Sequence, residues 1–466
     1  MKARGIVGMA TIGALAMIAG PCLAAQRTHR VGPGGHPTIA RALAVAAEGD
    51  TIRVAAGRYP ERLRIERRLT LLGEGWPVVD AGGEGHVVEA LAPVEIRGFV
   101  LRGSGTSLDG EHAGVMVRAA GSVVAGNRLE DVLYGICLKQ AGGSRVEGNR
   151  IAGKPFAPPR RGDGIRLWYS PDTRVTGNEV RGARDVVAYF SDHLMIEGNV
   201  IHAGRYGLHT MYIHHSRIAD NRMFDNQVGA FLMYSRDIRV DGNVFADAAA
   251  PSGMGLGLKD SDEVRVRGNL FVENSVGVYL DNSPGDPARR NVFEDNTFAG
   301  NGVAVRMLPS VSWNRFAGND FLSNGSPARV MGGARAEQVR QNEWAGNHWS
   351  DYAGFDGDGD GVGEAPYVHA HLADELLERR PELAIFAHAP ALAALDALVR
   401  WFPLLAPASV VVDPAPRLSR VAARRWTDER GPGQPAGRAL RGAGWALVVV
   451  AALAALRAGG RRRERG

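Results

Sequence analysis

Short runs in which apolar and polar residues alternate recur at nearly fixed intervals through most of the chain. Alternation with a period of two is typical of β-strands, because successive side chains point to opposite faces. A glycine opens many of these runs, at Gly135, Gly164, Gly207, Gly229, Gly255, Gly277 and Gly302. The residues one and three places after each glycine are apolar almost throughout. We therefore expect them to point inward and form a stacked core.

An asparagine that follows glycine or aspartate repeats in the same region. It occurs at Asn127, Asn149, Asn178, Asn199, Asn221, Asn243, Asn269, Asn296, Asn319 and Asn347. A repeat near 22 residues with short insertions is typical of a β-helix coil, in which two or three short strands are separated by turns. Asparagine tolerates a left-handed backbone, and its amide can bond to the asparagine of the next coil.

These patterns predict an all-β, right-handed, single-stranded parallel β-helix over residues 26–369, with a short helical segment at its C-terminal end. Residues 38–47 can form a capping helix, and residues 49–52 then turn into a first strand. This opening resembles that of pectin-lyase-like β-helices. Leucine-rich repeats are the rival, but their Leu-x-x-Leu-x-Leu pattern is absent.

Both ends of the chain carry targeting features. Residues 1–25 combine a basic start, an apolar core and small residues, as in a signal peptide. Residues 413–441 are expected to be a linker, 442–458 a transmembrane anchor and 459–466 a basic cytoplasmic tail. We therefore expect a periplasmic protein tethered to the membrane, although a surface-lying or disordered tail is the alternative.

Composition adds little beyond this. Charged residues make up 23% of the chain and the formal net charge is +5. Much of that excess lies in the C-terminal tail, so nucleic-acid binding is not implied. After signal cleavage Cys137 is the one remaining cysteine, which excludes an internal disulfide.

The positions two and four places after the column glycines should face outward. In the central coils they are unusually apolar and soft: Trp168, Tyr189, His209, Met211, Phe231 and Met233. His214 and His215 follow at the next turn. Thioether and imidazole groups suit Cu(I), so transient copper binding is one interpretation. A protein-docking patch without metal is another, and a patch covered by an inserted segment or assigned to the wrong face is the third.

An acidic loop near residue 360 is close to a calcium-binding loop. Asp356, Asp358, Asp360 and Glu364 occupy positions 1, 3, 5 and 9, with glycine at position 6. Position 12 is Tyr367 and not glutamate, so the match is partial. We expect a structural calcium ion here, with a plain turn as the alternative.

Residues 370–412 form the predicted helical segment. Leu392, Leu395, Val399 and Phe402 recur at helical spacing and would give one apolar face, beside Trp401. This face is expected either to dock a partner or to cap the open end of the solenoid.

Several motifs resemble the NosD family. They are GNHWSDY at 346–352 with the acidic loop and APY at 365–367, YGLHTMY at 206–212, LMYS at 232–235 and RWFP at 400–403. The resemblance covers roughly residues 30 to 415. The linker and apolar C-terminal stretch depart from the family pattern and suggest tethering of their own.

The resemblance implies a periplasmic, non-catalytic factor that matures nitrous-oxide reductase with an ABC transporter permease and a copper chaperone. It makes His209, Met211 and Met233 candidate copper contacts, and residues 370–402 a candidate permease-docking segment. Two rivals remain. One is a polysaccharide lyase or glycosidase using Asp163, Asp185 and Asp192, which fall at turns out of register. The other is a purely structural solenoid.

Overall fold

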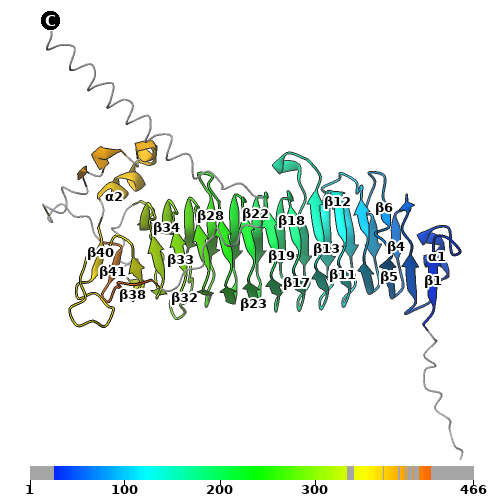
Figure 1. The fold of residues 1–466 in the computed structure, drawn as a ribbon, viewed down its shortest axis with the longest axis horizontal. Coiled ribbons are helices and arrows are strands. Elements are labelled where there is room, and N and C mark those ends of the chain that lie inside the picture. Colours follow the sequence, from blue (N-terminus) through cyan, green and yellow to red (C-terminus); the bar gives the residue numbers. More distant parts are fainter. Residues whose placement is uncertain are drawn as a thin grey trace, which may run out of the picture.

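The computed structural model describes residues 26–332, 341–370, 372–386, 389–392, 394, 395, 402 and 409–420. The predicted fold is confirmed: the chain winds as a right-handed parallel β-helix along one long axis (Figure 1). The predicted signal peptide, anchor and tail lie outside the described residues. Among the residues that are described, no helix is long and apolar enough to cross a membrane.

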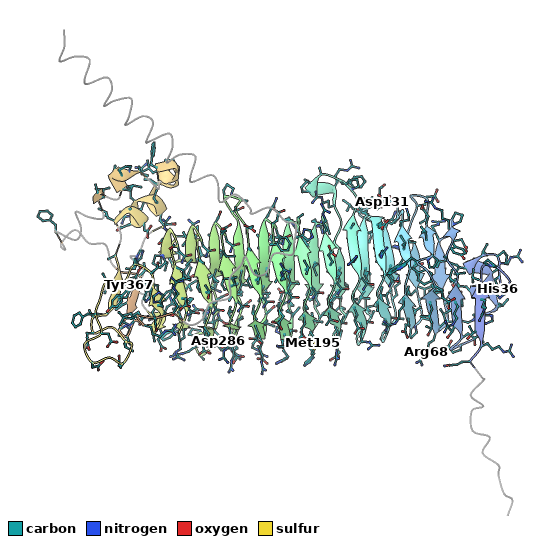
Figure 2. All side chains as sticks on the ribbon, viewed as in Figure 1. His36, Arg68, Asp131, Met195, Asp286 and Tyr367 are labelled. Atoms are coloured by element: carbon teal, nitrogen blue, oxygen red, sulfur yellow. The ribbon has the colours of Figure 1, made fainter. Side chains whose placement is uncertain are left out.

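Three parallel sheets, named A, B and C here, form the walls of the solenoid. Sheet A contains β1 (Thr28–Val31), β2 (Thr51–Val54), β5 (Leu69–Gly73), β8 (Val94–Arg97), β11 (Val123–Ala125), β14 (Arg145–Glu147), β17 (Arg174–Thr176), β20 (Met195–Glu197), β23 (His214–Ala219), β26 (Arg236–Asp241), β29 (Arg265–Arg267), β32 (Asn291–Glu294), β35 (Asn314–Ala317) and β38 (Glu343–Ala345). Met195 points outward from this sheet (Figure 2).

Sheet B forms the second wall. It contains β3 (Arg58–Tyr59), β6 (Val78–Asp80), β9 (Val100–Arg102), β12 (Arg128–Val132), β15 (Arg150–Gly153), β18 (Glu179–Arg181), β21 (Val200–His202), β24 (Arg222–Phe224), β27 (Val244–Ala246), β30 (Leu270–Val272), β33 (Thr297–Ala299), β36 (Asp320–Leu322) and β39 (His348–Trp349).

Sheet C forms the third wall and carries the column glycines. It contains β4 (Leu63–Ile65), β7 (Val88–Ala90), β10 (Ala113–Val117), β13 (Tyr134–Lys139), β16 (Ile165–Trp168), β19 (Asp185–Tyr189), β22 (Tyr206–Met211), β25 (Val228–Met233), β28 (Met254–Lys259), β31 (Val276–Asp281), β34 (Val303–Met307) and β37 (Ser326–Val330). A 3-10 turn, η1 (Pro158–Arg160), interrupts the connection between β15 and β16.

The core is built from stacked apolar side chains, as the alternation predicts. Leu232, Leu258 and Leu280 are all buried in equivalent positions of successive coils. The glycines are needed because the backbones approach closely: a Cβ on Gly229 would lie 2.4 Å from the carbonyl oxygen of Gly255. Burial of each large apolar side chain contributes about 2 kcal/mol, so the stacks dominate stability.

The repeated asparagines form a buried ladder, as predicted. The Asn221 Oδ1 accepts the backbone N–H of Asn199 at 3.0 Å and its side-chain amide at 2.9 Å. The Asn221 Nδ2 donates to Asn243 Oδ1 and to the carbonyl of Ile196. One part of the prediction is wrong: the residue before each asparagine, such as Gly198 or Asp220, adopts the left-handed backbone. The asparagine side chain is thereby directed into the core.

The N-terminal end is closed by the predicted helix, α1 (Ile39–Val45), which begins after a Thr38 side-chain cap. The first strand is nevertheless β1, which precedes this helix and pairs with β2. The carboxylate of Asp50 accepts the backbone N–H groups of Arg27 and Ala47 and contacts His29. The sequence prediction missed β1 because it lies before the first recognisable repeat.

The C-terminal end is closed by Asp413, which the sequence assigned to a linker. It ends β41 (Val411–Asp413), which pairs antiparallel with β40 (Tyr367–His369). Its carboxylate accepts hydrogen bonds from the backbone N–H and the side-chain amide of Asn347. Asp413 thus occupies the place that the asparagine of a further coil would take. Tyr367 lies at this end (Figure 2). Its ring stacks on that of Trp349, with centroids 4.3 Å apart. The folded domain therefore extends past residue 412.

Removing one rung of the ladder should destabilise the solenoid. Asn221→Ala leaves the Asn199 backbone N–H and the Ile196 carbonyl buried without these partners. We expect a loss of about 2 to 4 kcal/mol in unfolding free energy, measured by urea denaturation. The control is Asn282→Gly at an exposed turn with positive φ. Equal midpoints for the two variants would contradict a stabilising ladder.

The hydrogen bonds that Asp50 accepts should make the stability of the N-terminal end sensitive to acid. Backbone hydrogen bonds from Arg27, then the contact with His29, lower the pKa of Asp50 from 3.8 to about 2. A lowered pKa stabilises the fold above pH 3.8, and this contribution disappears as pH falls towards about 2. We expect Asp50→Ala to lower the unfolding temperature at pH 7 and to match wild type near pH 2. Asp109→Ala, at an exposed site, should not differ at either pH.

Candidate functional site

The outward residues of sheet C stand in two columns across successive coils. One column runs Lys139, Trp168, Tyr189, Met211, Met233, Lys259 and Asp281. The other runs Cys137, Arg166, Val187, His209, Phe231, Gly257 and Tyr279. The predicted residues Trp168, Tyr189, His209, Met211, Phe231 and Met233 are thus brought together, and we call them the stripe.

An ion pair lies at each end of the stripe. Lys139 pairs with Glu111 at one end, and Lys259 pairs with Asp281 at 3.0 Å at the other. Between them, both methionine side chains are half-buried, and Met211 lies directly opposite Met233 on the neighbouring strand. Paired strands lie about 4.8 Å apart, so the two thioethers can meet one ligand.

His209 is held by groups around its Nδ1 atom. The Tyr189 hydroxyl lies 2.8 Å from Nδ1, and the Asp185 carboxylate lies 3.9 Å from it. Burial raises the pKa of Tyr189 to about 12, so the phenol stays protonated. Within the part of the chain that the structure describes, the Nε2 of His209 makes no hydrogen bond. Nε2 can therefore bind a metal ion in the tautomer in which Nδ1 carries the proton and donates it to the Tyr189 oxygen.

Charged side chains surround Asp185, the carboxylate beside the His209 ring. Arg205 donates to Asp185 through Nε at 3.0 Å. Burial opposes ionisation of Asp185, but interactions with His209 and Arg205 outweigh it and lower its pKa. Asp163 is 1% exposed, and burial raises its pKa to about 6 despite the nearby Arg184. Arg184 contacts both carboxylates, so Asp163 and Asp185 lie close together, although the sequence placed the three aspartates out of register. Asp192 does not join them and accepts the backbone N–H of His214.

An exposed aromatic ladder, which the sequence reasoning missed, runs along the edge of the stripe. Tyr169, Phe190, Tyr212 and Tyr234 stack in order, with ring centroids 4.9, 5.2 and 5.0 Å apart. Each has positive φ, a backbone that bulky residues rarely adopt. Their spacing of 21 and 22 residues, directly after the outward strand positions, was the signal that could have found them.

His214 and His215 do not join the stripe. They begin β23 of sheet A, after the turn that follows Met211. The His215 Nδ1 lies 2.9 Å from Asp237, and its ring stacks on His193 at 5.4 Å. The sequence grouped them with His209 because they are neighbours in the chain, but the turn directs them to another wall.

The acidic loop brings together three of its four predicted ligands. Oxygen atoms of Asp356, Asp358 and Asp360 lie within 4.8 Å of one another on an exposed loop. Glu364 is not part of this group, and its Oε1 accepts the backbone N–H of Gly357 at 3.3 Å. The Asp356 carboxylate also accepts backbone N–H groups of the loop, so a plain turn remains a sufficient explanation.

The predicted docking face is only partly available. Leu392 is buried and, with Leu395, packs against α2 (Leu372–Arg379), which continues into the 3-10 helix η3 (Pro381–Phe386). Phe402 is exposed, while Val399 and Trp401 lie outside the described residues. Helix α2 is pinned to the solenoid by Glu378 with Arg306 and by Asp374 with Arg329. Helical spacing predicted an apolar face but not what covers it.

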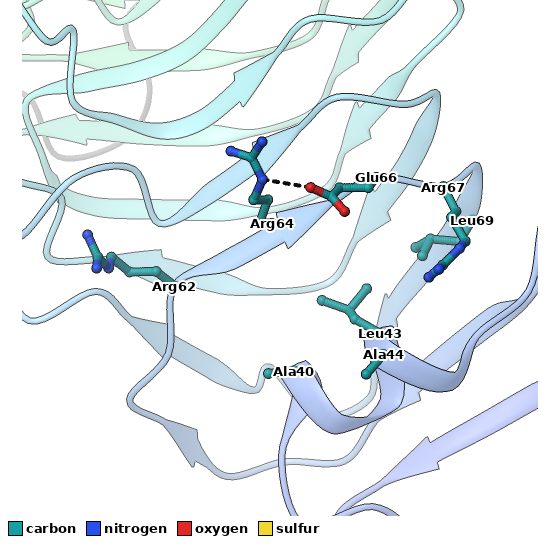
Figure 3. A pocket seen from close by; sticks show the side chains of 8 residues that line it. All are labelled: Ala40, Leu43, Ala44, Arg62, Arg64, Glu66, Arg67 and Leu69. Atoms are coloured by element: carbon teal, nitrogen blue, oxygen red, sulfur yellow. Dashed lines mark hydrogen bonds and ion pairs between the residues drawn. The ribbon is translucent and has the colours of Figure 1, made fainter.

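A separate open pocket lies beside α1, at the N-terminal end of the solenoid (Figure 3). Leu43 and Leu69 line it together with Arg62 and Arg64, and Arg64 donates to Glu66 at 2.9 Å. Strand β4, which carries Arg64, is four strands from β16 in sheet C. The pocket is thus remote from the stripe.

Comparison with known proteins gives relatives over most of the chain. Residues 147–354 match the family described as periplasmic copper-binding protein (NosD). A probable ABC transporter binding protein NosD from Pseudomonas aeruginosa is 30% identical over 414 residues, covering 78% of this chain and 87% of that protein. The protein of the same name from Stutzerimonas stutzeri is 27% identical, covering 76% and 83%.

Solved structures of other proteins resemble this chain in fold alone. The catalytic domain of a GH87 α-1,3-glucanase superposes with a TM-score of 0.53 at 13% identity, covering 71% of this chain and 70% of that one. The catalytic unit of a GH87 α-1,3-glucanase from Streptomyces thermodiastaticus gives 0.51 at 15% identity, covering 70% and 66%. At this identity the likeness says nothing about activity.

Removing the Tyr189 hydroxyl should release His209 without unfolding the site. Tyr189→Phe keeps the ring against Trp168 and removes only the bond to Nδ1. We expect a changed ¹⁵N chemical shift of His209 Nδ1, and a stability loss of about 1 kcal/mol. Tyr279→Phe, four coils from Tyr189 on the same sheet, is the control and should leave the His209 signal unchanged. An unaltered signal in Tyr189→Phe would disprove the hydrogen bond.

Proposed function

Because the chain belongs to the NosD family, we propose that it is a periplasmic, non-catalytic assembly factor for the copper centres of nitrous-oxide reductase. The stripe on sheet C would receive copper, or a copper-loaded partner. The observation that carries this proposal is the register of Met211 with Met233, beside His209. The family's description as copper-binding supports the same assignment.

The donor set of the stripe fits Cu(I). Two thioethers and one imidazole are soft or borderline ligands, which favour Cu(I) over hard cations. His209 would bind through Nε2, because Nδ1 is engaged by Tyr189. Cys137 lies in the same column but is fully buried, and burial raises the pKa of its thiol. It therefore supplies no thiolate, and a thioether site of this kind is suited to transfer more than to permanent storage.

The aromatic ladder and Trp168 would form the contact surface for a partner protein. Exposed aromatic side chains are enriched where proteins bind each other, and Tyr169 and Tyr212 are 49% and 41% exposed. The relatives' name supports an ABC transporter as one partner. We assign the copper chaperone and the reductase to the stripe side, and the permease to the C-terminal segment around α2 and Phe402. Residues 442–458 would anchor the chain in the membrane.

A polysaccharide-cleaving activity is less well supported. Glycosidases present two carboxyl groups to the substrate, and a lyase also needs its base to face the substrate. Asp163 is 1% and Asp185 2% exposed, and Arg184 bridges them. Those contacts favour a role for the two aspartates in orienting His209, which lies beside Asp185.

The stripe should bind Cu(I) through its methionines. Under anaerobic conditions we expect one tight Cu(I) equivalent on the protein, and at least about a tenfold weaker affinity in Met211→Ala/Met233→Ala, because soft ligands are lost. Affinity would be measured by competition with a colorimetric Cu(I) chelator.

Met195→Ala is the matched control, since Met195 is a half-buried outward methionine on sheet A. It should bind copper as wild type does. Equal affinity in the double variant and wild type would remove copper from the stripe. In that case a partner-docking role would be tested through reductase copper content in cells carrying Tyr212→Ala.

A further inference from the structure

A second column of turn residues lies at the edge of sheet A, away from the stripe. Asp172, His193, His215, Asp237 and Glu263 occupy equivalent turn positions in successive coils, and all have positive φ. We propose that His193 and His215 form a binding site for a divalent transition-metal ion such as Zn²⁺, supported by Asp172 and Asp237. This site is independent of the proposed copper stripe.

The two imidazoles are arranged as a pair. Their ring centroids are 5.4 Å apart and the ring planes are nearly parallel, at 18°. A carboxylate flanks each end: Asp172 lies 3.9 Å from His193 Nδ1, and Asp237 lies 2.9 Å from His215 Nδ1. Within the described residues, neither Nε2 makes a hydrogen bond. Both Nε2 atoms are therefore free to bind a ligand from solvent.

A carboxylate on Nδ1 is the arrangement that prepares histidine to bind metal. It fixes the tautomer with the lone pair on Nε2 and makes that nitrogen more basic. Here Asp237 lies at hydrogen-bond distance from His215 Nδ1, and Asp172 faces His193 Nδ1 on the other side of the pair at 3.9 Å. Aspartate and histidine also tolerate the left-handed turn better than most residues, which accounts for their presence. It does not account for both Nδ1 atoms facing acids, with the imidazoles stacked between.

Binding one ion requires both imidazole rings to rotate. Tetrahedral Zn²⁺ with two Zn–N bonds of about 2.0 Å separates the nitrogens by roughly 3.3 Å. The rings now lie in nearly parallel planes with centroids 5.4 Å apart, so each must turn to direct its Nε2 lone pair at the ion. Both side chains can rotate because they are largely in water, with 59% and 46% of their surfaces exposed.

The choice of ion follows from the donor types and not from the local charge. Arg236, Arg265 and Arg290 line the same hollow as His215, Asp237 and Glu263, and Arg289 pairs with Glu263. Imidazole nitrogen with carboxylate support suits Zn²⁺, Cu²⁺ or Ni²⁺ and discriminates against Ca²⁺. The remaining coordination positions would be filled by water.

The test is a calorimetric Zn²⁺ titration of the full-length protein, with Ca²⁺ present throughout to occupy the acidic loop. We expect one Zn²⁺ equivalent that is lost in both His193→Ala and His215→Ala. Asp237→Asn should weaken binding about 10- to 100-fold, because it removes only the supporting carboxylate. Circular dichroism would verify that each variant is folded.

The control is His202→Ala, since His202 stacks on Phe224 on sheet B and has no place in the column. Retained binding in this control, and in Met211→Ala/Met233→Ala, supports the assignment independently of the copper result. Wild-type Zn²⁺ affinity in both His193→Ala and His215→Ala would overturn the proposal. Equal loss in His202→Ala would also overturn it.

Discussion

The hydrogen bonds between successive coils fix each residue opposite its equivalent one coil away, and the whole structure depends on this register. Parallel pairing holds neighbouring strands about 4.8 Å apart, so a residue type that recurs in sequence becomes a column in space. The buried asparagine ladder maintains the register through paired amide bonds such as those between Asn199 and Asn221, and Asp413 ends it with a carboxylate. The alignment that stacks leucines inside also aligns Met211 with Met233 outside.

The aromatic ladder shows how a local cost is accepted at the site. A bulky residue with positive φ costs about 1 kcal/mol or more, and Tyr169, Phe190, Tyr212 and Tyr234 each have one. Each of the three aromatic contacts returns about 0.5 to 1.5 kcal/mol, so stacking offsets part of the strain. Tyr169 and Tyr212 are nonetheless exposed, which is consistent with contact with a partner. Beneath them, the Asp185, Arg205 and Tyr189 contacts hold His209 in one orientation.

Sequence alone predicted the solenoid, its core and most of the stripe, because periodicity maps directly onto register. It failed where direction depends on turns or on distant packing. His214 and His215 follow Met211 closely in the chain, but one turn moves them to sheet A. Leu392 has helical spacing with Leu395, yet the pattern does not reveal that α2 covers it. Asp413 looked like the start of a linker because its partner, Asn347, lies 66 residues away.

We propose that the stripe presents sulfur and imidazole ligands to copper. X-ray absorption at the copper edge tests it most directly, using protein loaded anaerobically with one Cu(I) equivalent. Thioether sulfur from Met211 and Met233 and nitrogen from His209 should make up the coordination shell. A shell of only nitrogen and oxygen donors would contradict the account and remove the methionine pair from copper binding.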